Sequence, residues 1–150
     1  MTPEELALRN AAARYLGEIQ TLRKTVVRQK MELDRLIHEL TGLKAIVYDK
    51  DRVQTSPTNM IEEQMVRLDE LTADYAMALA RREEAIRIRE EQIGKMPKVQ
   101  HREILIERYL RQRRKSFERI ACDTHRSYDR VKHLHTEALI EFARIFHIST

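Results

Sequence analysis

The amino-acid sequence predicts an all-α protein. A long two-helix coiled-coil stalk, folded as a helical hairpin over residues 1–97, precedes a helix-turn-helix over residues 98–150. The 150-residue chain has only three glycines and three prolines, and 35% of its residues are charged, which is typical of long solvated helices. Apolar residues recur with a heptad period early in the chain. In the last third, two serines stand where helix caps are expected, each before a short amphipathic segment.

The first helix of the stalk is expected over residues 3–47. Thr2 and Pro3 provide a helix start, and from Tyr15 apolar residues recur in alternating steps of four and three, the a/d pattern of a coiled coil. Gln29 is the polar exception at a core position, where such a residue fixes register or is simply tolerated. Because two helices alone bury too little surface, this seam is assigned to further copies, with a dimer favoured, or to a partner protein. The predicted interface residues are Ile19, Leu22, Val26, Gln29, Leu33, Leu36, Leu40 and Leu43.

A connecting loop is expected over residues 48–57, and a second helix over residues 58–94. The heptad pattern stops at the loop, and the Ser56-Pro57 pair disfavours helix at Ser56. The second helix carries a less regular apolar stripe and ends at Gly94. The similar lengths of the two helices permit an antiparallel pair.

Cysteine content and hydropathy bear on the cellular compartment. The single cysteine, Cys122, excludes an internal disulfide and fits a reducing environment. No apolar run approaches the length that spans a bilayer, and the first ten residues lack the features of a signal peptide. A cytoplasmic protein without a membrane partner is therefore expected.

The positive charge of the chain is concentrated at one end. Residues 1–98 contain 17 basic and 17 acidic residues, whereas residues 99–150 contain 11 basic and 7 acidic ones. The excess is densest over residues 111–132, with eight basic residues against three acidic ones. A neutral stalk joined to a basic terminal unit indicates that the terminal unit contacts a polyanion, although a solvated charged face has the same composition.

Residues 98–150 have the spacing of a helix-turn-helix. Ser116 caps a short helix containing Ala121, a small residue at the expected crossing of two helices. Ser127 caps the next helix, and Val131 anchors it ten residues after Ala121. This geometry exposes the first side chains of the second helix, as entry into the DNA major groove requires.

Several motifs within residues 99–146 carry a resemblance to a known family. They are Ile104-Leu105, Arg108-Tyr109-Leu110, Ser116-Phe117-Glu118-Arg119-Ile120-Ala121, Ser127-Tyr128-Asp129-Arg130-Val131-Lys132 and Ala138-Leu139. They resemble the promoter-reading C-terminal region of bacterial sigma factors. The whole layout is similar to small phage and prophage proteins, the RinA/ArpU-type regulators of late transcription, and residues 53–57 resemble a motif in their mid-chain loop. The chain has His125 where the family usually has glycine in the turn, and Arg126 where it has an apolar residue.

The resemblance implies five side chains that face the DNA groove, namely Tyr128, Asp129, Arg130, Lys132 and His133. Arg130 has the donors for a bidentate bond to guanine, and Asp129 can accept from cytosine or orient an arginine. Tyr128 can pack on a thymine methyl group. Six residues around the turn are assigned to phosphates, which set affinity and register rather than sequence. These are Arg113, Arg114, Lys115, Ser116, Arg126 and Ser127.

Enzymatic and metal chemistry have no recognisable signature in the sequence. Cys122 and the histidines near it match no common zinc-binding spacing. The three glycines form no phosphate-binding loop, and no nucleophile–base motif occurs. We therefore expect no enzyme, no bound metal and no cofactor.

These observations together predict a sequence-specific, double-stranded DNA-binding transcription regulator of a phage or prophage, acting in the bacterial host cytoplasm. Its sigma-like helix-turn-helix reads a promoter element, and its stalk oligomerises or contacts RNA polymerase. Two alternatives stay open. A DNA-packaging component resembling a small terminase subunit also joins a helix-turn-helix to a helical oligomerisation region. A structural coiled-coil adaptor would use the basic end only as a solvated surface.

Overall fold

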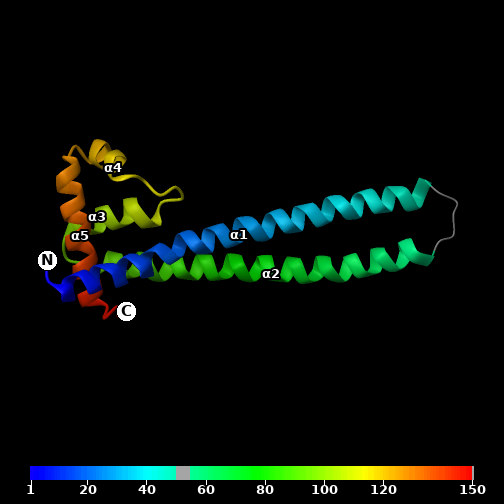
Figure 1. Ribbon diagram of the computed structural model, residues 1–150, viewed down its shortest axis with the longest axis horizontal. Coiled ribbons are helices and arrows are strands. Elements are labelled where there is room, and N and C mark those ends of the chain that lie inside the picture. The colour runs from blue at the N-terminus through cyan, green and yellow to red at the C-terminus, as the bar shows by residue number, and fades with distance from the viewer. Residues whose placement is uncertain (50–54, 150) are drawn as a thin grey trace. The chain divides into compact units, whose positions relative to one another are not determined.

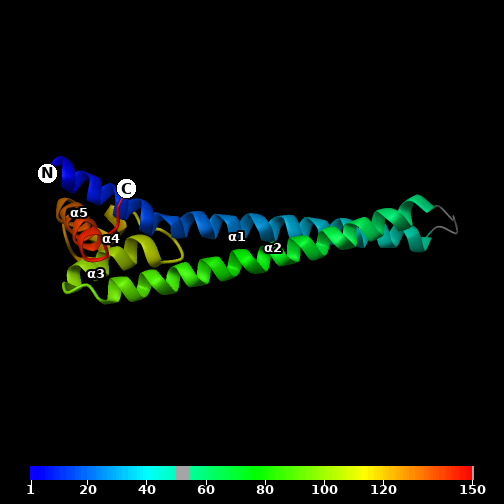
Figure 2. The same ribbon diagram turned by 90° about the horizontal axis from the view of Figure 1, so that it is seen from below.

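The computed structural model describes residues 1–49 and 55–149, with side chains for residues 1–42 and 59–149. All secondary structure in these ranges is helical, which confirms the all-α class (Figures 1 and 2). The helices are α1 (Pro3–Asp49), α2 (Thr55–Gly94), α3 (Val99–Leu105) with a π-helical continuation (Ile106–Leu110), α4 (Phe117–Thr124) and α5 (Tyr128–Ile145).

The chain divides into two compact units. Unit 1 consists of Met1–Thr21 together with Glu83–Thr150, and unit 2 of Leu22–Arg82. The sequence predicts a stalk that ends at residue 97 and a terminal domain that begins at residue 98. Contacts within the chain instead join the first turns of α1 and the last turns of α2 to the C-terminal helices.

In unit 2, α1 and α2 pack against each other through leucines. Leu36 and Leu40 of α1 and Leu71 of α2 are each 5% exposed and form one cluster, against which Leu33 and Leu68 pack. The heptad seam of α1 therefore meets α2 of the same chain. Leu33, Leu36 and Leu40, which are predicted to contact further copies or a partner protein, thus pack within one chain.

The remaining seam residues differ in burial. Ile19 and Val26 are buried in the single chain, while Leu22 and Gln29 are partly buried. The side chain of Leu43 lies outside the described ones. A second copy of the chain therefore has to use another face of the helices, and the oligomer itself stays a prediction.

The start of α2 differs from the predicted one. The helix begins at Thr55, within the expected loop, so Pro57 is its third residue. The first amides of a helix have no intrahelical acceptor, so a proline there removes no hydrogen bond. A proline disfavours the helical conformation of the residue before it, but Ser56 is nevertheless part of the helix. The other end of the loop is close to the prediction, since α1 continues to Asp49.

The first turn of α1 contains reciprocal caps. The Glu5 amide donates to Oγ1 of Thr2, and the Thr2 amide donates to Oε2 of Glu5, both at 3.1 Å. This capping box satisfies two amides that the helix itself leaves unpaired. Thr2 is thus the cap that the sequence predicts.

The core of unit 1 combines residues from both ends of the chain. Leu16 of α1 and Ile93 of α2 are completely buried in the same cluster as Phe142 of α5. The rings of Tyr15 and Phe142 are 5.8 Å apart. Figures 1 and 2 show α5 beside the first turns of α1. The C-terminal helices therefore share their core with the ends of the long helices.

Buried Arg89 strengthens this arrangement. Its guanidinium donates to the backbone oxygen of Tyr15 at 3.0 Å and to Oε2 of Glu18 at 2.6 Å. It also lies 3.9 Å from the centre of the Tyr15 ring. The arginine thus places a satisfied charge where α1 and α2 meet within unit 1, which explains a basic residue on the apolar seam of α2.

Candidate nucleic-acid interface

A serine cap begins α4, and a left-handed residue ends it at the turn before α5. The Ser116 hydroxyl caps α4 by accepting from the Arg119 amide at 3.1 Å. α4 ends at Thr124, and His125 takes the left-handed conformation with φ 55° and ψ 40°. The Arg126 amide then donates to the Ala121 oxygen at 3.0 Å, as in common helix C-caps. Histidine occupies a conformation in which glycine is easier to place.

The same kind of cap fixes the start of α5. The Ser127 hydroxyl accepts from the Arg130 amide at 3.1 Å. Val131 and Leu134 on the inner face belong to the core that also contains Ile120 of α4. Two serine caps and one apolar core therefore set the position of α5 relative to α4.

The predicted groove-facing side chains are all exposed on the first two turns of α5. They are Tyr128, Asp129, Arg130, Lys132 and His133. Nζ of Lys132 lies 5.4 Å from the centre of the Tyr128 ring, so these two share one side of the helix. Helical spacing places Asp129 and His133 together beside them. The surface offers donors, acceptors and an aromatic face within two turns.

Basic residues around the turn fall into two groups. Lys115 is bound to Glu107, and its Nζ lies 3.0 Å from Oδ2 of Asp123. Arg126 pairs with Glu103 at 3.3 Å. Both were predicted phosphate contacts, yet internal carboxylates already neutralise much of their charge.

Arg113 and Arg114 form the second group. Both are exposed, and neither forms an ion pair with any of the side chains that the structure describes, those of residues 1–42 and 59–149. The segment that carries them is anchored at Lys115, whose backbone oxygen accepts from the guanidinium of Arg108. That guanidinium also lies 4.3 Å from the centre of the Phe117 ring. The two exposed charges thus lie in the segment between the π-helical turn and α4.

Glu107 is the carboxylate that binds Lys115 and Arg111. Its side chain is only 14% exposed and accepts hydrogen bonds from both Arg111 and Lys115. Burial alone would raise the pKa of Glu107, but these hydrogen bonds and the two positive charges outweigh burial and hold that pKa below its ordinary value. The hydrogen bond to Glu107 also raises the pKa of Lys115. Lys115 therefore stays positively charged and links Glu107 to Asp123 of α4.

A buried histidine, His135, lies on the core-facing side of α5. Nε2 of His135 and the Tyr109 hydroxyl share a hydrogen bond of 2.8 Å, and the Phe117 ring lies 4.9 Å from the imidazole. Burial lowers the pKa of His135 to about 4, and the nearby charge of Arg108 adds to the effect. In the sequence, His135 is one of the histidines near Cys122 whose spacing matches no common zinc site, and no other role is predicted for it. Its place on the apolar face of the helix was the signal for a neutral core residue.

A second histidine links α3 to α5. His101 is 3% exposed, its Nδ1 is bound to the Glu141 carboxylate, and its Nε2 lies 3.6 Å from Oε2 of Glu137. Sequence reasoning missed this link because its partners lie about forty residues away along the chain.

Comparison with protein-family models, with curated proteins and with solved structures found no match to this chain. In the described part of the chain, no helix has the length and apolar character needed to cross a membrane. Among the same residues, no three histidine, cysteine or carboxylate side chains are grouped so as to hold a metal ion.

Proposed function

We propose that the chain binds double-stranded DNA as a sequence-specific transcription regulator, with α4 and α5 acting as a helix-turn-helix. The observation that carries the proposal is the exposed face at the start of α5. Arg113 and Arg114, in the segment before α4, add exposed positive charge to the same unit. A helix presented in this way can enter the major groove. The excess positive charge of residues 99–150 supports a polyanionic partner.

Base recognition is assigned to the first two turns of α5. Arg130 is exposed and three residues beyond the Ser127 cap, so its guanidinium can reach O6 and N7 of a guanine. Asp129 can accept from cytosine N4, and Tyr128 can pack on a thymine methyl group. Lys132 and His133 extend the same surface by one turn. Each assignment uses a side chain that is exposed in unit 1.

Phosphate contacts are assigned chiefly to Arg113 and Arg114. Lys115 and Arg126 are committed to carboxylates of the protein, so their release of counterions from DNA is expected to be smaller. Ser116 and Ser127 use their hydroxyl oxygens as helix caps but retain hydroxyl protons that can be donated to phosphate. Of the six predicted phosphate contacts, Arg113 and Arg114 are therefore expected to contribute most to DNA affinity.

The regulatory role rests on the resemblance to sigma-like phage and prophage proteins. In that proposal, α1 and α2 form a helical hairpin that brings together copies of the DNA-binding unit or contacts RNA polymerase. The packing of Leu36 and Leu71 supports the hairpin, and the exposed length of both helices leaves surface for a partner.

Selection from a pool of randomised duplexes tests the function. We expect the full chain to enrich a short motif containing guanine. Methylation of guanine N7, which blocks the major-groove edge, should then abolish binding at one or two positions of that motif. A pool that stays random, or binding that N7 methylation does not affect, contradicts major-groove reading by α5.

A further inference from the structure

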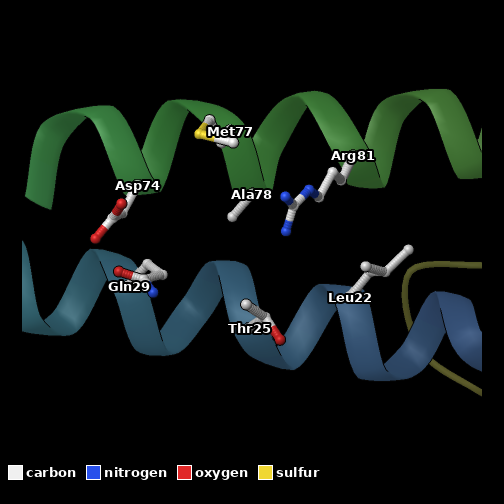
Figure 3. Close-up of a pocket in the computed structure, with 7 residues that line it drawn as sticks. All are labelled: Leu22, Thr25, Gln29, Asp74, Met77, Ala78 and Arg81. Carbon is white, nitrogen blue, oxygen red and sulfur yellow. The ribbon is translucent and has the colours of Figure 1, made fainter.

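A polar groove interrupts the leucine packing of unit 2. It has a volume of about 410 Å³ and is bounded by Leu22, Thr25, Gln29, Asp74, Met77, Ala78 and Arg81. Figure 3 shows Asp74, Ala78 and Arg81 extending from α2 towards α1. Oε1 of Gln29 is buried there without a hydrogen-bond partner. The two helices of one chain thus leave this place unfilled.

The α2 side of the groove carries charged side chains that form no ion pair among the described residues, together with exposed apolar surface. Asp74 and Arg81 are exposed and form no ion pair with any residue that the structure describes. Met77 is 54% exposed although it lies between them. Opposite charges that flank an exposed apolar side chain are suited to a contact with another molecule.

The order of these residues is self-complementary. Asp74 and Arg81 are seven residues apart, or two helical turns, and therefore lie on one side of α2. A two-fold axis between Met77 and Ala78 relates this segment to an antiparallel copy of itself. Each Asp74 then faces Arg81 of the second copy, and the two Met77 side chains meet. Isologous dimers have this property, because one patch supplies both halves of the contact.

We propose that the side of α2 formed by Asp74, Met77 and Arg81 binds the same surface of a second copy of this chain, in antiparallel orientation. This inference rests on the oligomerising stalk of the proposed function and names the surface that it uses. Ala78 is 8% exposed and stays buried within each chain, and the Met77 pair covers the open side of the groove. The heptad seam of α1 stays within each chain.

Charge reversal in the full chain tests the pairing by sedimentation equilibrium. Asp74→Arg and Arg81→Asp each create like-charge contacts twice in the dimer and should raise the dimer dissociation constant on the order of tenfold. An equimolar mixture of the two variants should restore dimerisation, since a dimer with one of each again pairs opposite charges. Asp69→Arg, on the opposite side of α2, is the matched control and should change nothing.

A cross-link supplies a second readout. In a Cys122→Ser background, Met77→Cys should form a disulfide-linked dimer on mild oxidation, whereas Asp69→Cys should not. A monomeric chain, a mixture that stays as weak as the single variants, or equal cross-linking at both positions overturns the proposal. If the chain dimerises but enriches no duplex from the randomised pool, only the proposed DNA recognition is contradicted. If the chain is monomeric but enriches a duplex, only the proposed dimer is contradicted.

Discussion

Basic side chains in the segment before α4 differ in how much of their charge nearby carboxylates of the protein neutralise. Lys115 contacts two carboxylates, while Arg114 is exposed without an ion pair in the described ranges. The sequence shows the two residues side by side in one basic run and gives no sign of this difference. It depends on Glu107 and Asp123, which approach Lys115 only when the turn has folded.

The first prediction follows from that difference. Arg114→Ala should lower the salt dependence of DNA binding by about one unit of slope, because one phosphate contact is lost. Lys115→Ala should change the slope much less and should instead lower thermal stability, because it leaves Glu107 with one cation fewer. Titrations at several salt concentrations and thermal melts measure the two effects. Equal losses of slope would show that Lys115 also binds phosphate.

The second prediction concerns His135, which is 6% exposed and has a pKa of about 4 in the folded chain. Its unfolded pKa is about 6.5, so the unfolded state binds more protons between these values. Stability should therefore be full above about pH 6.5 and fall by about 3 kcal/mol as the pH drops to about 4.

Denaturant titrations across this pH range test the assignment. His135→Gln keeps a group that can bond to Tyr109 but does not titrate, so most of the pH slope should disappear even if the variant is less stable overall. His133→Gln, an exposed change on the same helix, is the control and should keep the slope. A wild-type slope in His135→Gln would place the acid sensitivity elsewhere.

At the scale of elements, the sequence predicts the long helices well and their partners less well. The heptad period from Tyr15 and the cap at Thr2 are local signals, so the course of α1 could be predicted. Periodicity does not specify whether Leu36 meets a second copy or Leu71 of the same chain, because both partners are apolar helices. Likewise, Ser56-Pro57 indicates a break but does not distinguish the end of a loop from the first turn of a helix.

The third prediction tests the packing of α1 on α2. Leu36→Ala should destabilise unit 2 by about 2–5 kcal/mol, since it removes a buried side chain from a small cluster. Val27→Ala is a control on the same helix, because Val27 is 58% exposed, and it should cost less than about 0.5 kcal/mol. Circular dichroism melts of the full chain compare them. Equal melting curves would contradict the intramolecular leucine cluster.

At the scale of the whole molecule, the charge asymmetry and the serine caps in the sequence indicate where the candidate interface lies. The boundaries of unit 1 could not be predicted from the sequence. Met96 and Leu16 are distant in sequence from α5, yet both are buried in its core. Nothing in local periodicity connects such segments. A shared core of this kind becomes visible only in three dimensions.

The fourth prediction uses the composition of that core. A fragment of residues 98–150 lacks Leu16, Ile93 and Met96, whose burial is worth about 1.5–3 kcal/mol each. Their sum approaches the entire stability of a small domain, about 5–15 kcal/mol. The fragment should therefore melt without cooperativity, whereas a chain in which a flexible linker replaces residues 22–82 should melt cooperatively. Cooperative melting of the fragment at the temperature of the full chain would contradict the shared core.

The central claim is that α5 reads DNA bases, and Arg130→Ala tests it most directly. The measurement is the ratio of affinities for the selected duplex and a scrambled one, compared among wild type, Arg130→Ala and Arg114→Ala. Arg130→Ala should cost about 1–3 kcal/mol on the selected duplex only, because a base contact is lost. Arg114→Ala should weaken both duplexes alike and preserve the ratio. If Arg130→Ala weakens both duplexes by the same factor, α5 is not the reading helix.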